Sequence, residues 1–112
     1  MNIDLEYKAA VRQLNDEFRT TLAGGTLLLT AGIIALGAEA QAEIVSAVRA
    51  FSTFNQDNDP WGEHDFGALE FRDQRVFFKI DYYDPTRAMH SVDPTDPTRT
   101  ERVMTIMLAD EY

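Results

Sequence analysis

Apolar residues recur at intervals of three and four positions in two stretches of the chain, which is the spacing of one helical face. The first stretch contains Tyr7, Val11, Leu14, Phe18 and Leu22. It predicts an amphipathic helix over residues 4–22, ended by the glycine pair at 24–25. The second stretch contains Ile44, Val45, Val48 and Phe51. It predicts a second helix that follows Gly37 and runs to about residue 54.

Three other stretches have strand patterns. Residues 26–34 are apolar and bounded by glycines, which predicts a strand that is buried on both faces or lies in the middle of a sheet. Residues 66–72 and 76–83 show the period-two pattern of strands, and Asp73-Gln74 lies between them as a turn. These two stretches therefore predict a hairpin.

The last segment, residues 101–112, is compatible with two structures. Its central β-branched residues favour a strand that pairs with the hairpin, whereas its two ends also suit a helix. With a strand here, the predicted order is helix, strand, helix, strand, strand, strand. We therefore expect a single α+β domain over residues 1–112, with two helices packed on one face of a mostly antiparallel four-stranded sheet.

Composition adds an uneven charge to this picture. The chain of 112 residues has a net charge of −9, and residues 54–112 hold thirteen acidic and six basic side chains. Such a surface repels phosphate backbones and attracts basic proteins or cations, so direct nucleic-acid binding is disfavoured. There is no cysteine, which excludes disulfides and thiolate chemistry.

The first residues and the apolar runs predict a cytoplasmic protein with no membrane partner. The chain begins with acidic residues where a secretory signal has basic ones. The longest apolar run, residues 27–36, is far shorter than the roughly 20 residues that span a membrane. Gly24-Gly25-Thr26 lacks the lysine and the glycine spacing of a phosphate loop, and no cofactor is expected.

The loop before the hairpin, residues 55–65, holds the most suggestive chemistry. Asp57-Asn58-Asp59 resembles the start of a calcium loop, because alternate oxygen side chains can converge on one hard cation. Gly62 stands at the expected sixth position, but Ala68 occupies the twelfth, where a bidentate glutamate is required. An EF-hand is therefore disfavoured, and the alternative is an Asx-rich loop that hydrogen-bonds its own backbone.

Glu63-His64-Asp65 is the second feature of this loop. A histidine beside carboxylates suits a general acid, a general base or a metal ligand. Adjacent residues that enter a strand point to opposite sides, so the partner of His64 would come from elsewhere in the chain. The candidate metal ligands are His64, Asp65 and His90. The alternative is a structural histidine that orders the loop.

The exposed aromatic candidates lie among carboxylates rather than lysines. They are Trp61, Tyr82, Tyr83 and Tyr112. This arrangement lacks the electrostatics of a base-stacking platform, but it matches a protein-binding hot spot, in which an aromatic anchor is ringed by polar groups. The alternative is that these rings cap the edges of the core. No serine stands in a nucleophile-elbow motif, so no catalytic residue is predicted.

Three motifs carry a resemblance to a known family. They are GEHDFG (62–67), KIDYYD (79–84) and TIMLADEY (105–112). Together they resemble a family of small uncharacterised proteins, of unknown function, that occurs in alphaproteobacteria and in their plasmids and prophages. The resemblance covers nearly the whole chain and brings no established activity. It implies a bacterial, cytoplasmic protein from a mobile-element setting, where small acidic proteins that block defence complexes occur.

Two hypotheses from different classes follow. The leading one is a non-enzymatic inhibitor or adaptor that binds a basic, nucleic-acid-handling surface of a protein partner, of the anti-restriction or anti-CRISPR type. Its predicted partner-binding residues are Asp57, Asp59, Trp61, Glu63, Asp81 and Asp84. The rival is a metal-assisted hydrolase or small-molecule-binding enzyme built on His64 and nearby carboxylates. The sequence leaves the oligomeric state open.

Overall fold

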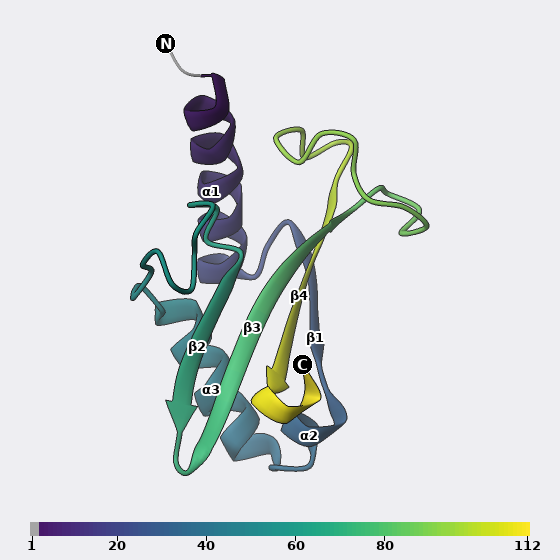
Figure 1. Ribbon diagram of the computed structural model, residues 1–112. Helices are drawn as coiled ribbons and strands as arrows, with labels where there is room; N and C mark the ends of the chain where they lie inside the picture. Colours follow the sequence, from purple (N-terminus) through teal and green to yellow (C-terminus); the bar gives the residue numbers. More distant parts are fainter. Residues whose placement is uncertain (1–2) are drawn as a thin grey trace.

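The computed structural model describes residues 3–112, and Figure 1 shows a four-stranded sheet with helices packed against it. The helices are α1 (Ile3–Thr21), α2 (Ala31–Ile34) and α3 (Ala38–Ala50). The strands are β1 (Gly25–Leu29), β2 (Phe66–Phe71), β3 (Gln74–Tyr83) and β4 (Glu101–Leu108), and the short 3₁₀ helix η1 (Ala109–Glu111) follows β4. The predicted α+β class is confirmed.

The sheet is mixed rather than mostly antiparallel, which corrects the prediction. Its strand order is β1-β4-β3-β2. The β2–β3 and β3–β4 pairs are antiparallel, whereas β1 pairs with β4 in parallel. The cause is α3, which carries the chain back along the sheet so that β2 starts in the direction of β1 (Figure 1). The two reversals of the β2-β3-β4 meander then restore that direction in β4.

The apolar stretch after α1 forms a shorter strand than predicted, and this strand lies at an edge of the sheet rather than in its middle. β1 ends at Leu29, and Leu28 is 47% exposed. The chain then enters α2, a helix that the sequence pattern did not indicate. A distant residue stabilises this change, because the Glu111 carboxylate accepts hydrogen bonds from the Thr30 hydroxyl at 2.6 Å and the Gly32 N–H at 2.9 Å.

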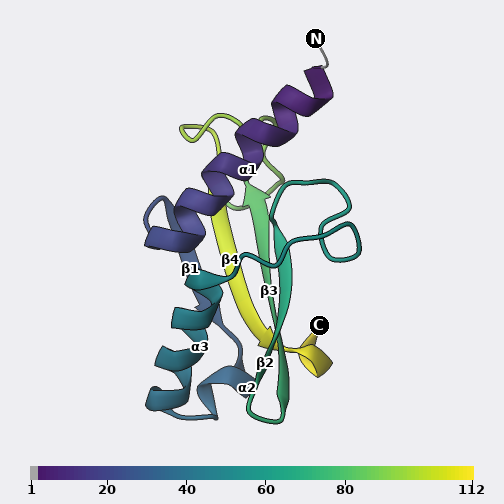
Figure 2. The same cartoon turned by 90° about the vertical axis from the view of Figure 1, so that its left-hand side faces the viewer.

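The core lies between the sheet and the two long helices, which cover the same face (Figure 2). Phe18 of α1 and Ile44 and Val48 of α3 are at most 1% exposed. They form one cluster with Phe78 of β3 and Met104 of β4, which are also fully buried. Removal of each of these side chains from water contributes about 1.5–3 kcal/mol to stability.

Three boundaries complete the comparison with the sequence pattern. The hairpin turn is Arg72-Asp73 rather than Asp73-Gln74, because β3 already begins at Gln74. The last segment is mainly the strand β4, which lies between β1 and β3, and only its end forms η1. The helix α3 ends at Ala50, before the predicted residue 54, because Phe51 adopts an extended backbone. The rings of Phe51 and Phe54 then meet edge to face at 4.9 Å beside the core. Within the described part of the chain, no helix is both long and apolar enough to cross a membrane.

Candidate functional site

The candidate site is the loop of residues 55–65, which we call the Trp61 loop. Its first half hydrogen-bonds its own backbone, because the Asn55 side chain accepts the N–H groups of Asp57 at 2.8 Å and Asn58 at 3.1 Å. The Asn58 side chain in turn accepts the Asn55 N–H at 3.0 Å. These contacts are those of an Asx-rich turn, in which side-chain oxygens bind N–H groups of the loop's own backbone.

The buried Asp59 side chain hydrogen-bonds the backbone of the second half of the Trp61 loop. The residue is 8% exposed. One carboxylate oxygen accepts the N–H groups of Glu63 and His64, each at 3.1 Å. Asp59 therefore fixes the turn that presents Trp61, and its carboxylate faces the loop rather than solvent.

His64 joins this loop to α1. Its Nδ1 lies 2.9 Å from Oδ1 of Asp16, and its Nε2 lies 3.6 Å from Oδ2 of Asp59. The imidazole also stacks on Phe54, with ring centroids 3.8 Å apart and an interplanar angle of 4°. Both ring nitrogens thus face carboxylates of the chain itself, and this arrangement favours the structural role of His64 over that of a catalytic base.

Asp16 also binds Arg19. Arg19, which is 4% exposed, donates from Nη1 to Asp16 at 3.0 Å and from Nη2 to the carbonyl of Phe51 at 3.1 Å. Its guanidinium lies 5.1 Å from the centre of the Phe54 ring. Arg19 therefore connects α1 to the chain that leaves α3 and fixes the base of the Trp61 loop.

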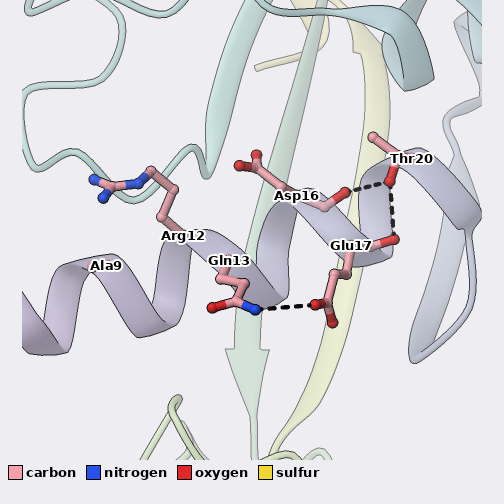
Figure 3. A pocket seen from close by; sticks show the side chains of 6 residues that line it. All are labelled: Ala9, Arg12, Gln13, Asp16, Glu17 and Thr20. Atoms are coloured by element: carbon pink, nitrogen blue, oxygen red, sulfur yellow. Dashed lines mark hydrogen bonds between the residues drawn. The ribbon is translucent and has the colours of Figure 1, made fainter.

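The outer side of α1 beside these contacts is a groove that Figure 3 shows from close by. Gln13 and Glu17 bond to each other along the helix at 3.4 Å. Arg12 leaves the helix in another direction and donates to the carbonyl of Gly62 at 3.0 Å. Arg12 and Asp16 thus serve the Trp61 loop, whereas Gln13 and Glu17 remain on the exposed helix surface.

A buried polar network holds the loop from below. Asn15 is fully buried, and its Nδ2 donates to the carbonyl of Glu63 at 2.9 Å and to the hydroxyl of Tyr82 at 2.8 Å. Its Oδ1 accepts a hydrogen bond from Arg102 at 2.8 Å. The Tyr82 hydroxyl completes the network by donating to the Glu63 carboxylate at 2.9 Å. Glu63 is therefore held by Asn15 of α1 and Tyr82 of β3, and Arg102 of β4 supports it through Asn15.

Burial sets the protonation of this network. Burial, together with the neighbouring charge of Glu63, raises the pKa of the nearby Asp65 to about 6. Burial likewise raises the pKa of Tyr82, which keeps its hydroxyl protonated as a donor. The pKa of Arg102 is lowered by burial, yet the guanidinium remains the cation of the network because its ordinary pKa is far above neutral.

The other residues predicted from the sequence lie at three places. Asp57 is exposed on the Trp61 loop, and Trp61 is 66% exposed with the Lys8 ammonium 5.6 Å from its ring centre. Asp81 pairs with Lys79 at 3.1 Å on β3. Asp84 and His90 belong to the loop after β3.

Asp84 accepts the N–H and hydroxyl of Thr86 at 3.0 and 2.6 Å, and these contacts lower its pKa. His90 stacks on Tyr83 at 6.0 Å. The structure thus brings Asp59, Trp61, Glu63, His64 and Asp65 together and places Asp81 close enough for its charge to act on Asp65, whereas Asp84 and His90 lie on the loop after β3. Over residues 3–112, no group of three or more histidine and acidic side chains is placed to hold a metal ion.

Sequence reasoning missed Asn15, Asp16, Arg19 and Arg102, which form most of this site. One signal was present, since Asn15 falls four positions after Val11 on the apolar face of its helix. A polar residue at such a position is buried and needs partners. The identity of those partners was not readable, because they lie 48, 67 and 87 positions away in the chain.

Comparison with known proteins gives a family but no activity. No curated protein and no solved structure matches the chain. The sequence model of one protein family, described as "Protein of unknown function (DUF3768)", matches residues 29–111. This match covers most of the 112 residues, including the whole Trp61 loop and its partners on β3 and β4. The chain therefore belongs to the DUF3768 family of proteins of unknown function.

Proposed function

We propose that this protein is a small, non-enzymatic binding protein whose Trp61 loop docks on a basic surface of a protein partner. The observation that carries the proposal is the position of Trp61, which is 66% exposed on a loop that is hydrogen-bonded on both sides of it. A large exposed aromatic residue has no role in the core. On a fixed loop it loses little conformational entropy when it binds, which is the property of a hot-spot anchor.

The buried polar residues that fix the loop support the same proposal. Asn15 and Arg102 are polar groups with at most 3% exposure, and burial of such groups costs free energy unless every bond is made. Hydrophobic residues at these positions would give a simpler core. The buried polar network instead fixes the backbone of Glu63, two residues after Trp61. We infer that selection favoured the position of the loop over the stability of the core.

The net charge of residues 54–112 suggests the partner, although Lys8 lies against Trp61 itself. Asp57 is exposed on the same loop, and Glu63 is half-buried beside it. Residues 54–112 hold thirteen acidic and six basic side chains, so the surrounding field attracts a cationic surface. Asp81 and Asp84 add to this field from β3 and the loop after it. Asp59, which is buried, positions the loop and makes no contact with the partner in this proposal.

Basic protein surfaces of this kind commonly bind nucleic acid. The more specific proposal is therefore an inhibitor that occupies the nucleic-acid site of a restriction or CRISPR-type complex. In this form the acidic loop takes the place of the phosphate backbone, and Trp61 provides an apolar anchor that a nucleic-acid mimic by charge alone would lack.

The test is capture of partners from bacterial lysate on the immobilised protein, followed by affinity measurement with the purified partner. We expect Trp61→Ala to weaken binding about 30-fold, which corresponds to about 2 kcal/mol. Asp57→Lys is expected to weaken binding and to reduce its dependence on salt. Ile34→Ala is the matched control, because Ile34 is a large apolar residue that is 55% exposed and lies at the end of α2, far from the loop in Figure 1.

The binding result for each variant is interpreted together with its melting temperature. Trp61 is exposed, so Trp61→Ala is expected to leave the melting temperature within a degree or two of wild type, in line with the roughly 0.5 kcal/mol typical of surface changes. A partner retained equally by wild type and Trp61→Ala would overturn the assignment of the loop. Retention that does not weaken as salt rises would overturn the proposed basic partner.

A further inference from the structure

We propose that the outer edge of β1 pairs with β1 of a second copy of this chain, which makes the protein a two-fold homodimer with one continuous sheet. β1 is an end strand of the sheet, and Figure 1 shows no described strand or helix beyond it. An end strand presents unpaired backbone donors and acceptors that a further strand can bind. This inference does not depend on the function proposed for the Trp61 loop.

The register of the sheet identifies the free backbone groups. The N–H of Thr30, directly after β1, donates to the carbonyl of Ile106 at 3.1 Å, and β1 and β4 are parallel. Alternate residues of a parallel strand bond to the same neighbour, so Thr26 and Leu28 also direct their backbone groups to β4. The residues between them direct their N–H and C=O groups away from the sheet. These are Gly25, Leu27 and Leu29.

β1 lacks the features that normally prevent such pairing. Edge strands of monomeric proteins usually carry a charge, a proline or a bulge. The sequence of β1 is GTLLL, it pairs with β4 without a bulge, and Leu28 is 47% exposed. The opposite edge of the sheet is better protected, since the segment 51–58 runs beside β2 and Phe51 packs at Gly67 (Figures 1 and 2).

An antiparallel second copy fits this edge residue by residue. With a two-fold axis at Leu27, the free backbone groups of Gly25 in one copy meet those of Leu29 in the other, and the two Leu27 residues meet each other. On the face away from the helices, Leu28 then lies opposite Thr26 of the second copy. Each exposed leucine is thereby covered by the methyl-bearing side chain of a threonine.

The charges at the two ends of β1 select the same arrangement. At one end, Arg87 binds the Thr26 hydroxyl at 2.6 Å and Glu101 at 3.0 Å, and its side chain is still 51% exposed. At the other end, the exposed Glu111 binds Thr30 at 2.6 Å. Antiparallel pairing brings the Arg87 end of each copy to the Glu111 end of the other. Parallel pairing would place the two Glu111 carboxylates together, so charge favours the antiparallel dimer.

The first test is the mass of the protein in solution by sedimentation equilibrium. We expect wild type to approach twice the 12.7 kDa of one chain as its concentration rises. Leu28→Lys places a charge at the pairing edge and is expected to raise the dimer dissociation constant at least about tenfold. Leu5→Lys is the matched control, since Leu5 is 63% exposed in the first turns of α1, far from β1 in Figure 1. It is expected to leave the dissociation constant unchanged.

The second test identifies the surface by amide hydrogen exchange. As concentration rises, the amides of Leu27 and Leu29 are expected to become protected, whereas those of Thr26 and Leu28 are protected at every concentration by their bonds to β4. A wild-type protein that stays at the mass of one chain would overturn the proposal. A dimer in which Leu27 and Leu29 gain no protection, or which Leu28→Lys and Leu5→Lys affect equally, would overturn it as well.

Discussion

Replacement of Asn15 by alanine removes the centre of the buried polar network. Three bonds are lost, which join Asn15 to the Glu63 carbonyl, the Tyr82 hydroxyl and the Arg102 guanidinium at 2.8–2.9 Å. The two neutral bonds contribute about 1 kcal/mol each, and the bond to the cation contributes about 2 kcal/mol. Alanine recovers about 0.6 kcal/mol through its better helix propensity. We therefore expect Asn15→Ala to lower the free energy of unfolding by about 3 kcal/mol.

The assay is urea denaturation followed by two signals. Far-UV circular dichroism reports the whole fold, and fluorescence of Trp61, the one tryptophan of the chain, reports the loop. A loss of about 3 kcal/mol lowers the urea midpoint by about 1–3 M for a typical slope. Because the network holds the loop, we also expect Trp61 fluorescence in the absence of urea to indicate a more mobile side chain in Asn15→Ala than in wild type.

Two comparisons make this prediction refutable. Gln13→Ala is the control on the same helix, because Gln13 is exposed and bonds only Glu17 at 3.4 Å, and it is expected to change stability by less than about 0.5 kcal/mol. Asn15→Asp keeps the size and the acceptor for Arg102 but loses both Nδ2 donors, so it is expected to loosen the loop as well. A cost below about 1 kcal/mol for Asn15→Ala, with unchanged Trp61 fluorescence, would refute the role of the network.

Three further predictions concern pH, packing and metal ions. The pKa of Asp65 is about 6 in the folded protein against an ordinary 3.8, so the folded state binds this proton more tightly and stability falls as the pH rises through that interval. Asp65→Asn, measured by urea denaturation, is expected to gain about 1–2 kcal/mol above pH 6 and nothing below about pH 4, with the gain reduced by partial exposure. A side chain at Gly67 would collide with the buried Phe78 ring, so Gly67→Ala is expected to cost about 1–3 kcal/mol in thermal unfolding. Because both nitrogens of His64 face carboxylates, we expect Mg²⁺ or Zn²⁺ to leave the melting temperature unchanged; a rise that His64→Ala abolishes would instead support the metal-dependent hydrolase.

The elements that the sequence predicted correctly are those whose signal is local. The apolar spacing of α1 and the alternation in β3 each follow from which side chains face the core, and they appear in the sequence at the period of the element. The sequence predicted β2 and α3 correctly for the same reason. The position of β1 did not, because the neighbour of a strand depends on the path of α3 and the meander rather than on its own residues.

The candidate site was predictable only in part for the same reason. The residues 55–65 before the hairpin marked the Trp61 loop, and the hot-spot interpretation of Trp61, which is 66% exposed, stays a prediction. The role of His64 depends on Asp16, and the role of Glu63 depends on Asn15, both of which lie 48 positions earlier on a helix. Spacing within a motif carries no information about such partners, so a histidine that fixes a loop and a histidine that binds a metal look alike in the sequence.

The two proposed surfaces lie on opposite sides of the sheet, and this arrangement has a consequence for binding. β1 forms one border of the sheet, and the segment that contains the Trp61 loop lies beside β2 at the other border (Figure 1). Pairing through β1 therefore leaves both Trp61 loops free, separated by the width of eight strands, or roughly 35 Å at about 4.8 Å per strand step. The two-fold axis also points the loops toward opposite ends of the sheet. Such a dimer can bind two copies of a partner, or two sites on one complex, with an avidity that a monomeric variant loses while each loop keeps its own affinity.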